Sequence, residues 1–380
     1  SPWEGAPSWR DWALTADPST AQARVRSIGG DLDPLALNSS GERLMIVDVL
    51  VHDETLFALL GWYAPSPESE EPGTGVLDCR LELVRMNLAD GEIAGSLALA
   101  DKAVVVARGP GLGGSLTRMS DGAILVTNTV GQPCFALAVV VDPDSMTARL
   151  DATSVVDAPE GSYTLDHLGE GVLRRTIWDE HNQPTSRILV DMRSGERIEA
   201  EQGWTPARVL GDWLYSYEDG KLDDASAPWR AVNLRSHDAV QVDHRLPGRC
   251  LINGARLENG IVIIEETPGG RKKGSHVVLG EAHSPGATAG VTIAPGDDLG
   301  SEALVEHGGL RWSRSVGADA SGHGELVCWD PADGAETGRI AVAGGVGLAG
   351  LSAWGYWTTT AFVPATAWRE GVEEWKNAVA

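Results

Sequence analysis

Residues 326–340 read Leu326-Val327-Cys328-Trp329-Asp330-Pro331-Ala332-Asp333-Gly334-Ala335-Glu336-Thr337-Gly338-Arg339-Ile340. An apolar strand leads into an Asp-Gly turn and a second strand returns from it, which is the pattern of a β-hairpin. The same shape recurs earlier in the chain, at residues 83–93, 139–145, 188–196 and 231–238 and, in a degenerate form, at 276–280. The chain is therefore built from a repeated β unit.

Another hairpin with a short polar or glycine turn precedes each of these, and one more occurs near the C-terminus. Their turns lie at His52-Asp53-Glu54, Ser120-Asp121-Gly122, Gly169-Glu170-Gly171, Leu210-Gly211-Asp212, Glu258-Asn259-Gly260, His307-Gly308-Gly309 and Ala353-Trp354-Gly355. Successive turns are 41 to 49 residues apart after a first interval of 68, close to the ~40 to 50 residues of a four-stranded propeller blade. We predict an all-β fold, a seven-bladed β-propeller, with six or eight blades as alternatives.

The two ends of the repeat differ from the rest. Residues 64–75 are a Pro-rich acidic insertion between the second and third strands of the first blade, which explains the long first interval. The last unit, at 351–357, has no clear second hairpin, and an N-terminal strand at 23–28 has the alternation needed to complete it and remove the open edge. We expect one propeller domain over 23–362, preceded by an N-terminal arm over 1–22 that carries Trp3, Trp9 and Trp12.

The C-terminal segment, residues 363–380, has a different period. Its apolar side chains fall at i, i+4, i+7 and i+11, which is a helical stripe, although Gly371 is unfavourable within it. These side chains are Trp368, Val372, Trp375 and Val379. We predict a short helix that packs over the rim of the propeller, with a partner-binding helix as the alternative.

The unit at Ser115–Thr127, followed by a strand and an Asp-x-x-Asp-Gly turn as at Asp330–Gly334, resembles the repeat of quinoprotein-type (PQQ-like) β-propellers. The resemblance covers most of residues 40–362, and the YVTN-like, WD40-like and lactonase-like propellers are similar to the same degree. The PQQ-like family usually has a Trp soon after the turn, where this chain has Gly338, Arg339 and Ile340. The resemblance implies a quinone cofactor, a calcium site and often vicinal cysteines for a quinoprotein dehydrogenase. No residues of this sequence match those features.

The charge of the chain limits its partners. Thirty Lys and Arg stand against 54 Asp and Glu, a formal net charge of −24, which disfavours nucleic acid and anionic membranes. No run of 18 apolar residues occurs, so we expect no direct membrane insertion. Because the first residue is Ser, we expect that a leader or anchor was removed upstream and that the protein is extracytoplasmic, secreted or anchored at the cell surface. Five Lys against 25 Arg suggest a bacterial source.

The four cysteines lie far apart and include no C-x-x-C pair, which argues against a sulfur-bound metal. They are Cys79, Cys134, Cys250 and Cys328. The cysteines either form two disulfides or remain as four buried thiols, and the sequence does not choose between these alternatives. Cys79 with Cys134 is the first pair to test.

Two glycine-rich segments, at 109–114 and 345–350, match the G-x-G-x-x-G pattern of dinucleotide loops. The first is followed by six residues and an Asp-Gly turn instead of a helix, so both are predicted to be loops that lead into inner strands. The acidic segments at 142–145 and 330–334 have carboxylates at calcium-loop spacing but no EF-hand pattern. Turn hydrogen bonds are the simpler prediction.

Histidines follow carboxylates at Asp166-His167, Asp243-His244 and Glu306-His307. Neighbours on a strand point to opposite faces, so these pairs are not catalytic dyads, and surface or turn positions are expected for the histidines. The sequence contains no H-E-x-x-H, nucleophile elbow or P-loop. We therefore assign no catalytic, cofactor-binding or metal-binding residue and predict no cofactor.

The loops between second and third strands are long and emerge on one face of a propeller, where function usually concentrates. They lie at 64–78, 179–186, 218–228, 267–274 and 315–323 and carry Glu68, Glu70, Glu71, Arg271, Lys272 and Lys273, with Trp178 and Trp229 flanking two of them. We expect a non-catalytic, monomeric binding or scaffold module that holds a protein or carbohydrate partner on this face.

One alternative is a propeller enzyme, either a lactonase-like hydrolase or a quinone-dependent sugar dehydrogenase, with a metal in the central channel and PQQ or calcium as cofactor. Another is a purely structural domain of a larger surface protein. Because propellers host both enzymes and binding proteins, the fold alone does not choose between these functions.

Overall fold

The computed structural model describes most of the inner part of the chain. The described residues are 11–17, 22–27, 30–31, 43–65, 75–106, 114–128, 136–157, 162–181, 183–222, 227, 229–242, 255–258, 261–266, 275–281, 291–293, 305–316, 324–330, 332, 335–341, 350–358, 360–369 and 371–373.

Strands in this part of the chain form seven antiparallel sheets, which we call A to G. Sheet B contains β4 (Arg43–His52), β5 (Thr55–Pro65), β6 (Gly75–Asn87) and β7 (Ile93–Val106). Sheet C contains β8 (Ser115–Arg118), β9 (Ile124–Thr127), β10 (Ala138–Asp142) and β11 (Thr147–Asp151) and is followed by the single turn of α1 (Thr153–Val156). Sheet D contains β12 (Ser162–Gly169), β13 (Val172–Trp178), β14 (Pro184–Asp191) and β15 (Glu196–Ile198).

The remaining sheets have the same order of strands. Sheet E contains β16 (Trp204–Leu210), β17 (Trp213–Glu218), β18 (Trp229–Asn233) and β19 (Ala239–Val242). Sheet F contains β20 (Ala255–Glu258), β21 (Ile261–Glu266), β22 (Ser275–Glu281) and β23 (Val291–Ile293). Sheet G contains β24 (Val305–His307), β25 (Leu310–Val316), β26 (Gly324–Trp329) and β27 (Glu336–Ala341).

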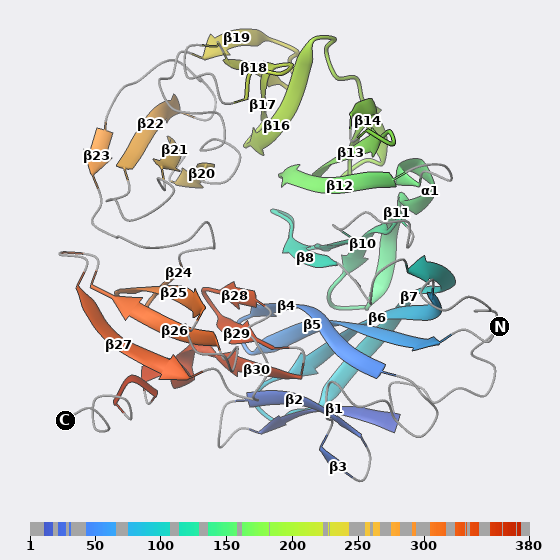
Figure 1. Ribbon diagram of the computed structural model, residues 1–380, viewed down its shortest axis with the longest axis vertical. Helices are drawn as coiled ribbons and strands as arrows, with labels where there is room; N and C mark the ends of the chain where they lie inside the picture. The colour runs from blue at the N-terminus through green and yellow to red at the C-terminus, as the bar shows by residue number, and fades with distance from the viewer. Residues whose placement is uncertain are drawn as a thin grey trace.

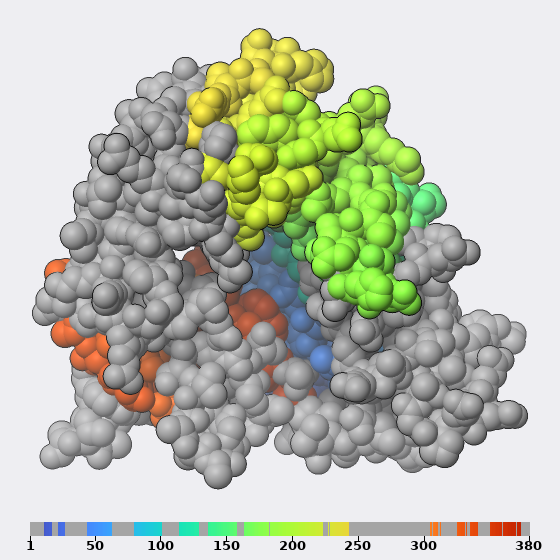
Figure 2. Space-filling view, turned by 45° about the horizontal axis from the view of Figure 1, so that its top comes forward, coloured from blue at the N-terminus to red at the C-terminus, as the bar shows by residue number. Residues whose placement is uncertain are grey.

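The sheets follow one another around a ring, with the first strand of each turned toward the centre (Figure 1). In the space-filling view the centre of the ring is hollowed, and blue atoms of the segment 43–65, which holds β4 and β5, are visible at its floor (Figure 2). The predicted all-β propeller is therefore the fold of this protein. Six of the seven first-hairpin turns expected from the sequence lie between two adjacent strands of one sheet, and the seventh, at Glu258-Asn259-Gly260, lies in part outside the described residues.

Sheet A joins the two ends of the chain. Its strands β28 (Gly350–Ser352), β29 (Gly355–Trp357) and β30 (Ala361–Pro364) continue into β2 (Gln22–Ser27), with Ala23 opposite Phe362. This confirms the expected closure by an N-terminal strand, which leaves no open edge between the first and last units.

The N-terminal arm expected over residues 1–22 is in part a strand of this sheet. Strand β1 (Trp12–Asp17) pairs with β2 along its whole length, and β3 (Gly30–Asp31) pairs with β2 as well. Trp12 is buried and meets the fully buried Trp62 of sheet B edge to face, with ring centroids 5.6 Å apart. Burial of two indoles explains why this segment adds to the sheet. Trp3 and Trp9 lie outside the described residues.

The third strand of a sheet commonly ends in a side-chain cap. In sheet C, Asp142 Oδ1 accepts the backbone N–H groups of Asp144 and Ser145 at 3.0 and 2.9 Å. These bonds, that of Ser145 foremost, lower the pKa of Asp142. Equivalent bonds to the N–H two residues on are made by Asn87, Asp191, Asn233 and Asp330. The turn interpretation of the acidic segments at 142–145 and 330–334 is confirmed for these carboxylates.

The described part of the C-terminal segment is partly helical and packs against sheet G. It continues from β30 through a short 3-10 turn, Ala365–Ala367, into helical residues at 368–369 and 371–373. Trp368 is buried against Trp312, with ring centroids 4.7 Å apart, and Val372 is buried beside it. Trp375 and Val379 lie outside the described residues.

Glycines allow this helical segment to approach sheet G closely. A Cβ at Gly338 would meet Val372 at 2.8 Å, and one at Gly371 would meet Ile340 at 2.8 Å. Gly338 stands near the position after the turn at which the PQQ-like repeat usually has a Trp. In this chain the C-terminal segment covers that part of the strand. The same close contact accounts for a glycine within a helical stripe.

Cys328 is buried in β26, where its Sγ lies 3.4 Å from the Gly338 carbonyl oxygen. It is a thiol in the structure. The proposed Cys79–Cys134 pair, and Cys250, lie outside the residues whose side chains are described. Among the helices of the described part of the chain, none has the length and apolar character to cross a membrane.

Candidate functional site

We name the two faces of the ring after the connections between strands that each face carries. The turn face bears the turns between strands one and two and between strands three and four of each sheet. The loop face bears the loops between strands two and three and the links from one sheet to the next. The loop face is the one on which the sequence places a binding function.

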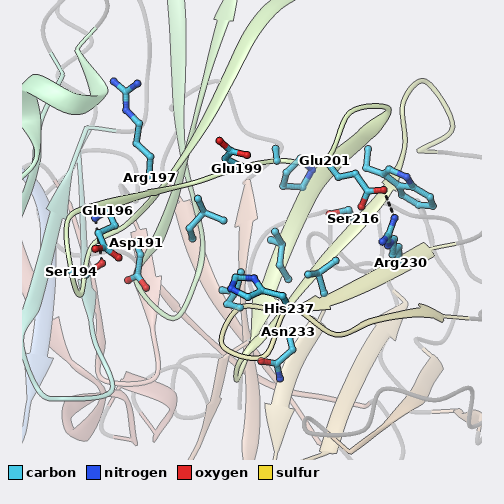
Figure 3. Close-up of a pocket in the computed structure, with 17 residues that line it drawn as sticks. Asp191, Ser194, Glu196, Arg197, Glu199, Glu201, Ser216, Arg230, Asn233 and His237 are labelled. Carbon is cyan, nitrogen blue, oxygen red and sulfur yellow. Dashed lines mark hydrogen bonds and ion pairs between the residues drawn. The ribbon is translucent and has the colours of Figure 1, made fainter.

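A groove of about 670 Å³ lies between sheets D and E. One wall is formed by β15 and the link that follows it, and the other by the broad side of β16, β17 and β18. Glu201 and Arg230 lie at one end of it, whereas Asp191, Ser194 and Glu196 of sheet D and Asn233 and His237 of sheet E lie away from that end (Figure 3). Its volume is within the range of small-molecule sites.

The end of the groove on the loop face is organised around Trp204, the first residue of β16. Glu201 in the preceding link forms an ion pair with Arg230 of β18. The Arg230 guanidinium carbon lies 5.9 Å from the centroid of the half-buried Trp204 ring. The ion pair and the cation–π contact hold three side chains from the link, β16 and β18 at one opening.

The end of the groove on the turn face is closed by the capped turns of sheets D and E. Asp191 accepts the N–H of Arg193 at 2.8 Å and also pairs with its guanidinium. Asn233 accepts the N–H groups of Arg235 and Ser236, and His237 in the same turn has a positive φ of 62°. The groove is therefore lined by polar groups that short-range turn bonds already orient.

Two loops of the loop face are partly described, and they are joined to each other. Arg187 of β14 forms an ion pair of 3.0 Å with Asp219, which follows β17. Thr205 of β16 donates to the same carboxylate. The loop carrying Glu68, Glu70 and Glu71 and the loop carrying Arg271, Lys272 and Lys273 lie outside the described residues, as do the middle parts of the others.

The two tryptophans expected beside these loops are not exposed binding groups. Trp229 is fully buried in the core of sheet E. Trp178 is partly buried and its Nε1 donates to Thr164 Oγ1 at 3.1 Å. The sequence missed Trp204 because nothing in its local pattern separates an aromatic in a groove from an aromatic in the core.

Half-buried titratable groups lie on the inner strands. Asp48 of β4 accepts the N–H of Leu116 in the next sheet at 2.6 Å and that of Val49 at 2.9 Å. Burial raises the pKa of Asp48 to about 6, against the lowering effect of these two bonds. The pairing of β4 with β5 shifts register between Ile46 and Asp48, so a β-bulge turns the carboxylate toward its partner.

His167, expected at the surface or in a turn, lies near the end of strand β12 and is half-buried. Its Nε2 accepts the N–H of Gly171 at 3.2 Å. Burial first, and then the positive charge of Arg208, lowers its pKa to about 4. Asp166, its neighbour, pairs with Arg174 at 2.8 Å instead, so Asp166-His167 is not a dyad. His244 lies outside the described residues.

The glycine-rich segments agree with their simpler interpretation where they are described. Gly114 is followed directly by strand β8, and Gly350 begins strand β28, so neither segment opens a helix. Among the described residues, no three His, Cys, Asp or Glu side chains lie close enough together to hold a metal ion.

No protein-family profile matches the chain, and no curated protein matches it. Among solved structures, it is similar to an uncharacterized protein from Listeria monocytogenes, with 10% identity, a TM-score of 0.40, and 80% of this chain and 83% of that chain covered. It is similar to TolB from Acinetobacter baumannii, with 13% identity, a TM-score of 0.36 and 79% of each chain covered. It is also similar to the β-propeller domain of the Trilobed protease from Pyrococcus furiosus, with 11% identity, a TM-score of 0.40, and 81% and 86% covered.

Proposed function

We propose that this chain is a non-catalytic, extracytoplasmic β-propeller that acts as a binding or scaffold module, holding a protein or carbohydrate partner on its loop face. Within the propellers, its repeat resembles the quinoprotein-type and YVTN-like groups, as a non-enzymatic member. It acts as a monomer and needs no cofactor for this role.

The observation that carries the proposal is the groove between sheets D and E, which opens on the loop face beside Trp204. A half-buried indole offers a flat apolar surface with a polar edge. The carboxylate of Glu201 and the guanidinium of Arg230 lie beside it, and the amide of Asn233 and the imidazole of His237 line the groove farther along. An aromatic side chain at the opening of a groove lined by planar polar groups favours a carbohydrate over a flat protein surface.

A panel of immobilised oligosaccharides, followed by calorimetric titration of the best ligand, tests this. We expect saturable binding that Trp204→Ala weakens at least about tenfold. Trp354→Ala is the matched control, because Trp354 is 48% exposed and lies in a turn on the opposite face. Equal binding by Trp204→Ala and the unaltered protein would remove the groove from the proposal.

Failure of every oligosaccharide to bind would favour the protein partner. A photo-crosslinking residue in place of the exposed Glu199 should then join a partner protein, whereas one at Trp354 should not. Metal analysis with thermal unfolding in the presence and absence of EDTA addresses the enzyme alternative. A stoichiometric metal whose removal lowers the melting temperature would favour a propeller enzyme and contradict the proposal.

A further inference from the structure

The wall of the groove between sheets D and E contains a buried hydroxyl group, that of Ser216 on β17. Ser216 is only 6% exposed, and its Oγ has no hydrogen-bond partner in the part of the chain that the structure describes. It lies opposite Arg230 in the pairing of β17 with β18, near the Glu201 end of the groove (Figure 3). Buried hydroxyl groups are nearly always hydrogen-bonded, so this one is available to a polar group of a ligand.

Strand β15 turns its acidic side chain toward the groove and its arginine away from it. In the pairing with β14, Glu196 lies opposite Asp191 and Arg197 lies opposite Val190. Val190 belongs to the apolar cluster between sheets C and D, whereas Ile198 packs against the cluster between sheets D and E. Neighbouring side chains of a strand point to opposite faces, so Glu196 faces sheet E. Arg197 also borders the groove, but its guanidinium is directed away from the other labelled side chains (Figure 3).

Two of the carboxylates in the groove are already neutralised by guanidinium groups. Asp191 pairs with Arg193 at 2.6 Å. Glu201 pairs with Arg230 at the other end. Because these ion pairs use the charge of both arginines, neither pair leaves a positive charge for an anionic ligand.

The carboxylates of Glu196 and Glu199 remain uncompensated. Both residues line the groove and are exposed, and neither forms an ion pair with another described residue. Glu196 also lies directly opposite Asp191, and like charges in that position repel each other. A protonated amine on a ligand would relieve this repulsion and form charge-assisted hydrogen bonds, and the net charge of −24 attracts cations to the chain.

We propose that the groove binds an oligosaccharide that carries free amino groups. Glu196 and Glu199 accept hydrogen bonds from its ammonium groups. The Ser216 hydroxyl bonds a sugar hydroxyl at the end of the groove that carries Trp204. This inference rests on the proposed function and narrows its ligand to a cationic sugar: the carboxylates select by charge, whereas the hydroxyl and the indole make contacts that a neutral sugar shares.

Calorimetric titration of three probes tests this, at a pH below the pKa of the sugar amines. The probes are a glucosamine tetramer, its fully N-acetylated form and trilysine. We expect the glucosamine tetramer to bind at least about tenfold more tightly than the N-acetylated one, with a difference that shrinks as salt is added.

The outcomes separate this inference from the proposed function. Equal affinities of the two tetramers would overturn the selection by charge but leave the groove as a sugar site. Binding of other oligosaccharides but of neither tetramer would overturn this inference alone, and failure of every oligosaccharide would remove the carbohydrate site as well. Tighter binding of trilysine than of the glucosamine tetramer would show that the groove selects a cationic peptide, which would overturn the choice of a sugar.

Variants assign the roles within the groove. Glu196→Gln and Glu199→Gln should each reduce the preference for the glucosamine tetramer about threefold, while binding of the N-acetylated tetramer stays the same. Ser216→Ala should weaken the binding of both tetramers by a similar factor. It should not lower the melting temperature, because the hydroxyl has no partner to lose among the described residues.

Glu92→Gln is the matched control. Glu92 follows the turn of sheet B that corresponds to the turn before Glu196, and both turns are closed by a glycine N–H, at 2.8 and 2.7 Å. Glu92 is exposed and is not among the residues that line the groove. Equal effects of Glu92→Gln and Glu196→Gln would show that the overall charge of the chain attracts the ligand, which would contradict recognition by the groove.

Discussion

The junction between sheets B and C and the junction between sheets D and E both bring strands of two neighbouring sheets together. They differ in whether their polar groups find hydrogen-bond partners. At the first, Asp48 meets the N–H of Leu116 on the neighbouring inner strand. Buried side chains of both sheets also form one apolar cluster there, including Leu59 and Val126. At the second, Arg174 of β13 donates to the Pro206 carbonyl across the junction, but Arg208 has a buried Nε without a partner.

The B–C junction is therefore a structural contact, whereas the D–E junction retains a buried N–H donor without a partner among the described residues. An unpaired buried donor costs free energy that a paired one does not. The D–E junction also borders the groove that opens on the loop face.

The largest expected effect comes from adding a Cβ atom at Gly169, where the backbones of sheets D and E lie very close together. Gly169 has a φ of +114°, and a Cβ there would lie 2.3 Å from the Val209 carbonyl oxygen. Gly169→Ala should lower the free energy of unfolding by about 4 kcal/mol or more, because neither backbone can move aside easily. Urea unfolding measures this.

The matched variant at the B–C junction is Gly114→Ala. There a Cβ would lie 2.7 Å from Leu59 Cδ2 and 3.1 Å from Val47 Cγ1, which are ends of side chains. A loss of only about 1 kcal/mol is expected, because methyl groups can shift. A larger loss for Gly114→Ala than for Gly169→Ala would reverse the comparison.

The pH dependence of stability should be governed at sheet D by His167. Its pKa falls from 6.5 to about 4 on folding, so the unfolded chain binds more protons between these values. The contribution of His167 is fully present above pH 6.5 and is lost as the pH falls through about 4, by up to about 3 kcal/mol. Relative to His167→Gln, the unaltered protein should therefore lose stability as the pH falls from 6.5 to about 4. A difference in unfolding free energy that does not change with pH would contradict the burial of the ring.

Asp48 at sheet B should give a slightly smaller effect of opposite sign. Its pKa rises from 3.8 to about 6 on folding, so the folded protein binds more protons in that window. Relative to Asp48→Asn, the unaltered protein should be most stable below pH 3.8 and lose up to about 3 kcal/mol as the pH rises through 6. Stability that instead increased with pH, relative to this variant, would mean that the two N–H bonds outweigh burial.

The smallest expected effect is that of Arg208→Met. Replacing a partly buried guanidinium whose Nε has no hydrogen-bond partner in the described chain by an apolar side chain should leave the stability unchanged or raise it by about 1 kcal/mol. Arg174→Met is the comparison, because Arg174 pairs with Asp166 and donates to Pro206, and its loss should cost about 2 kcal/mol. Equal losses in thermal or urea unfolding would show that Arg208 is also held within the protein.

Much of the fold could be predicted from local pattern. The hairpin turns at Asp121-Gly122 and Gly169-Glu170-Gly171, the capped turn at Asp142 and the closing strand near Ala23 depend on alternation and turn chemistry within a few residues. Strand β1 was missed because its place depends on Trp12 packing against Trp62, 50 positions away.

The candidate sites could be predicted much less well. His167 and Trp204 look like ordinary strand residues in the sequence, and Trp229 looks like a possible surface aromatic. Which of them is buried, and against what, depends on β-bulges and on which sheet lies beside which. The bulge next to Asp48 and the one next to His167 leave no mark in the sequence that alternation alone could reveal.

The sequence by itself determined the repeated four-stranded unit and the turns, because these follow from interactions between residues close in the chain. Local alternation at residues 23–28 also indicated the closing strand, although its partner Phe362 lies at the other end of the chain. Only the tertiary structure decided which polar groups on the inner strands find partners. Asp48 and Leu116 are 68 positions apart and meet only because two sheets pack side by side. Arg208 lacks such a partner within the described chain for the same reason, since pairing across a junction depends on packing and not on local pattern.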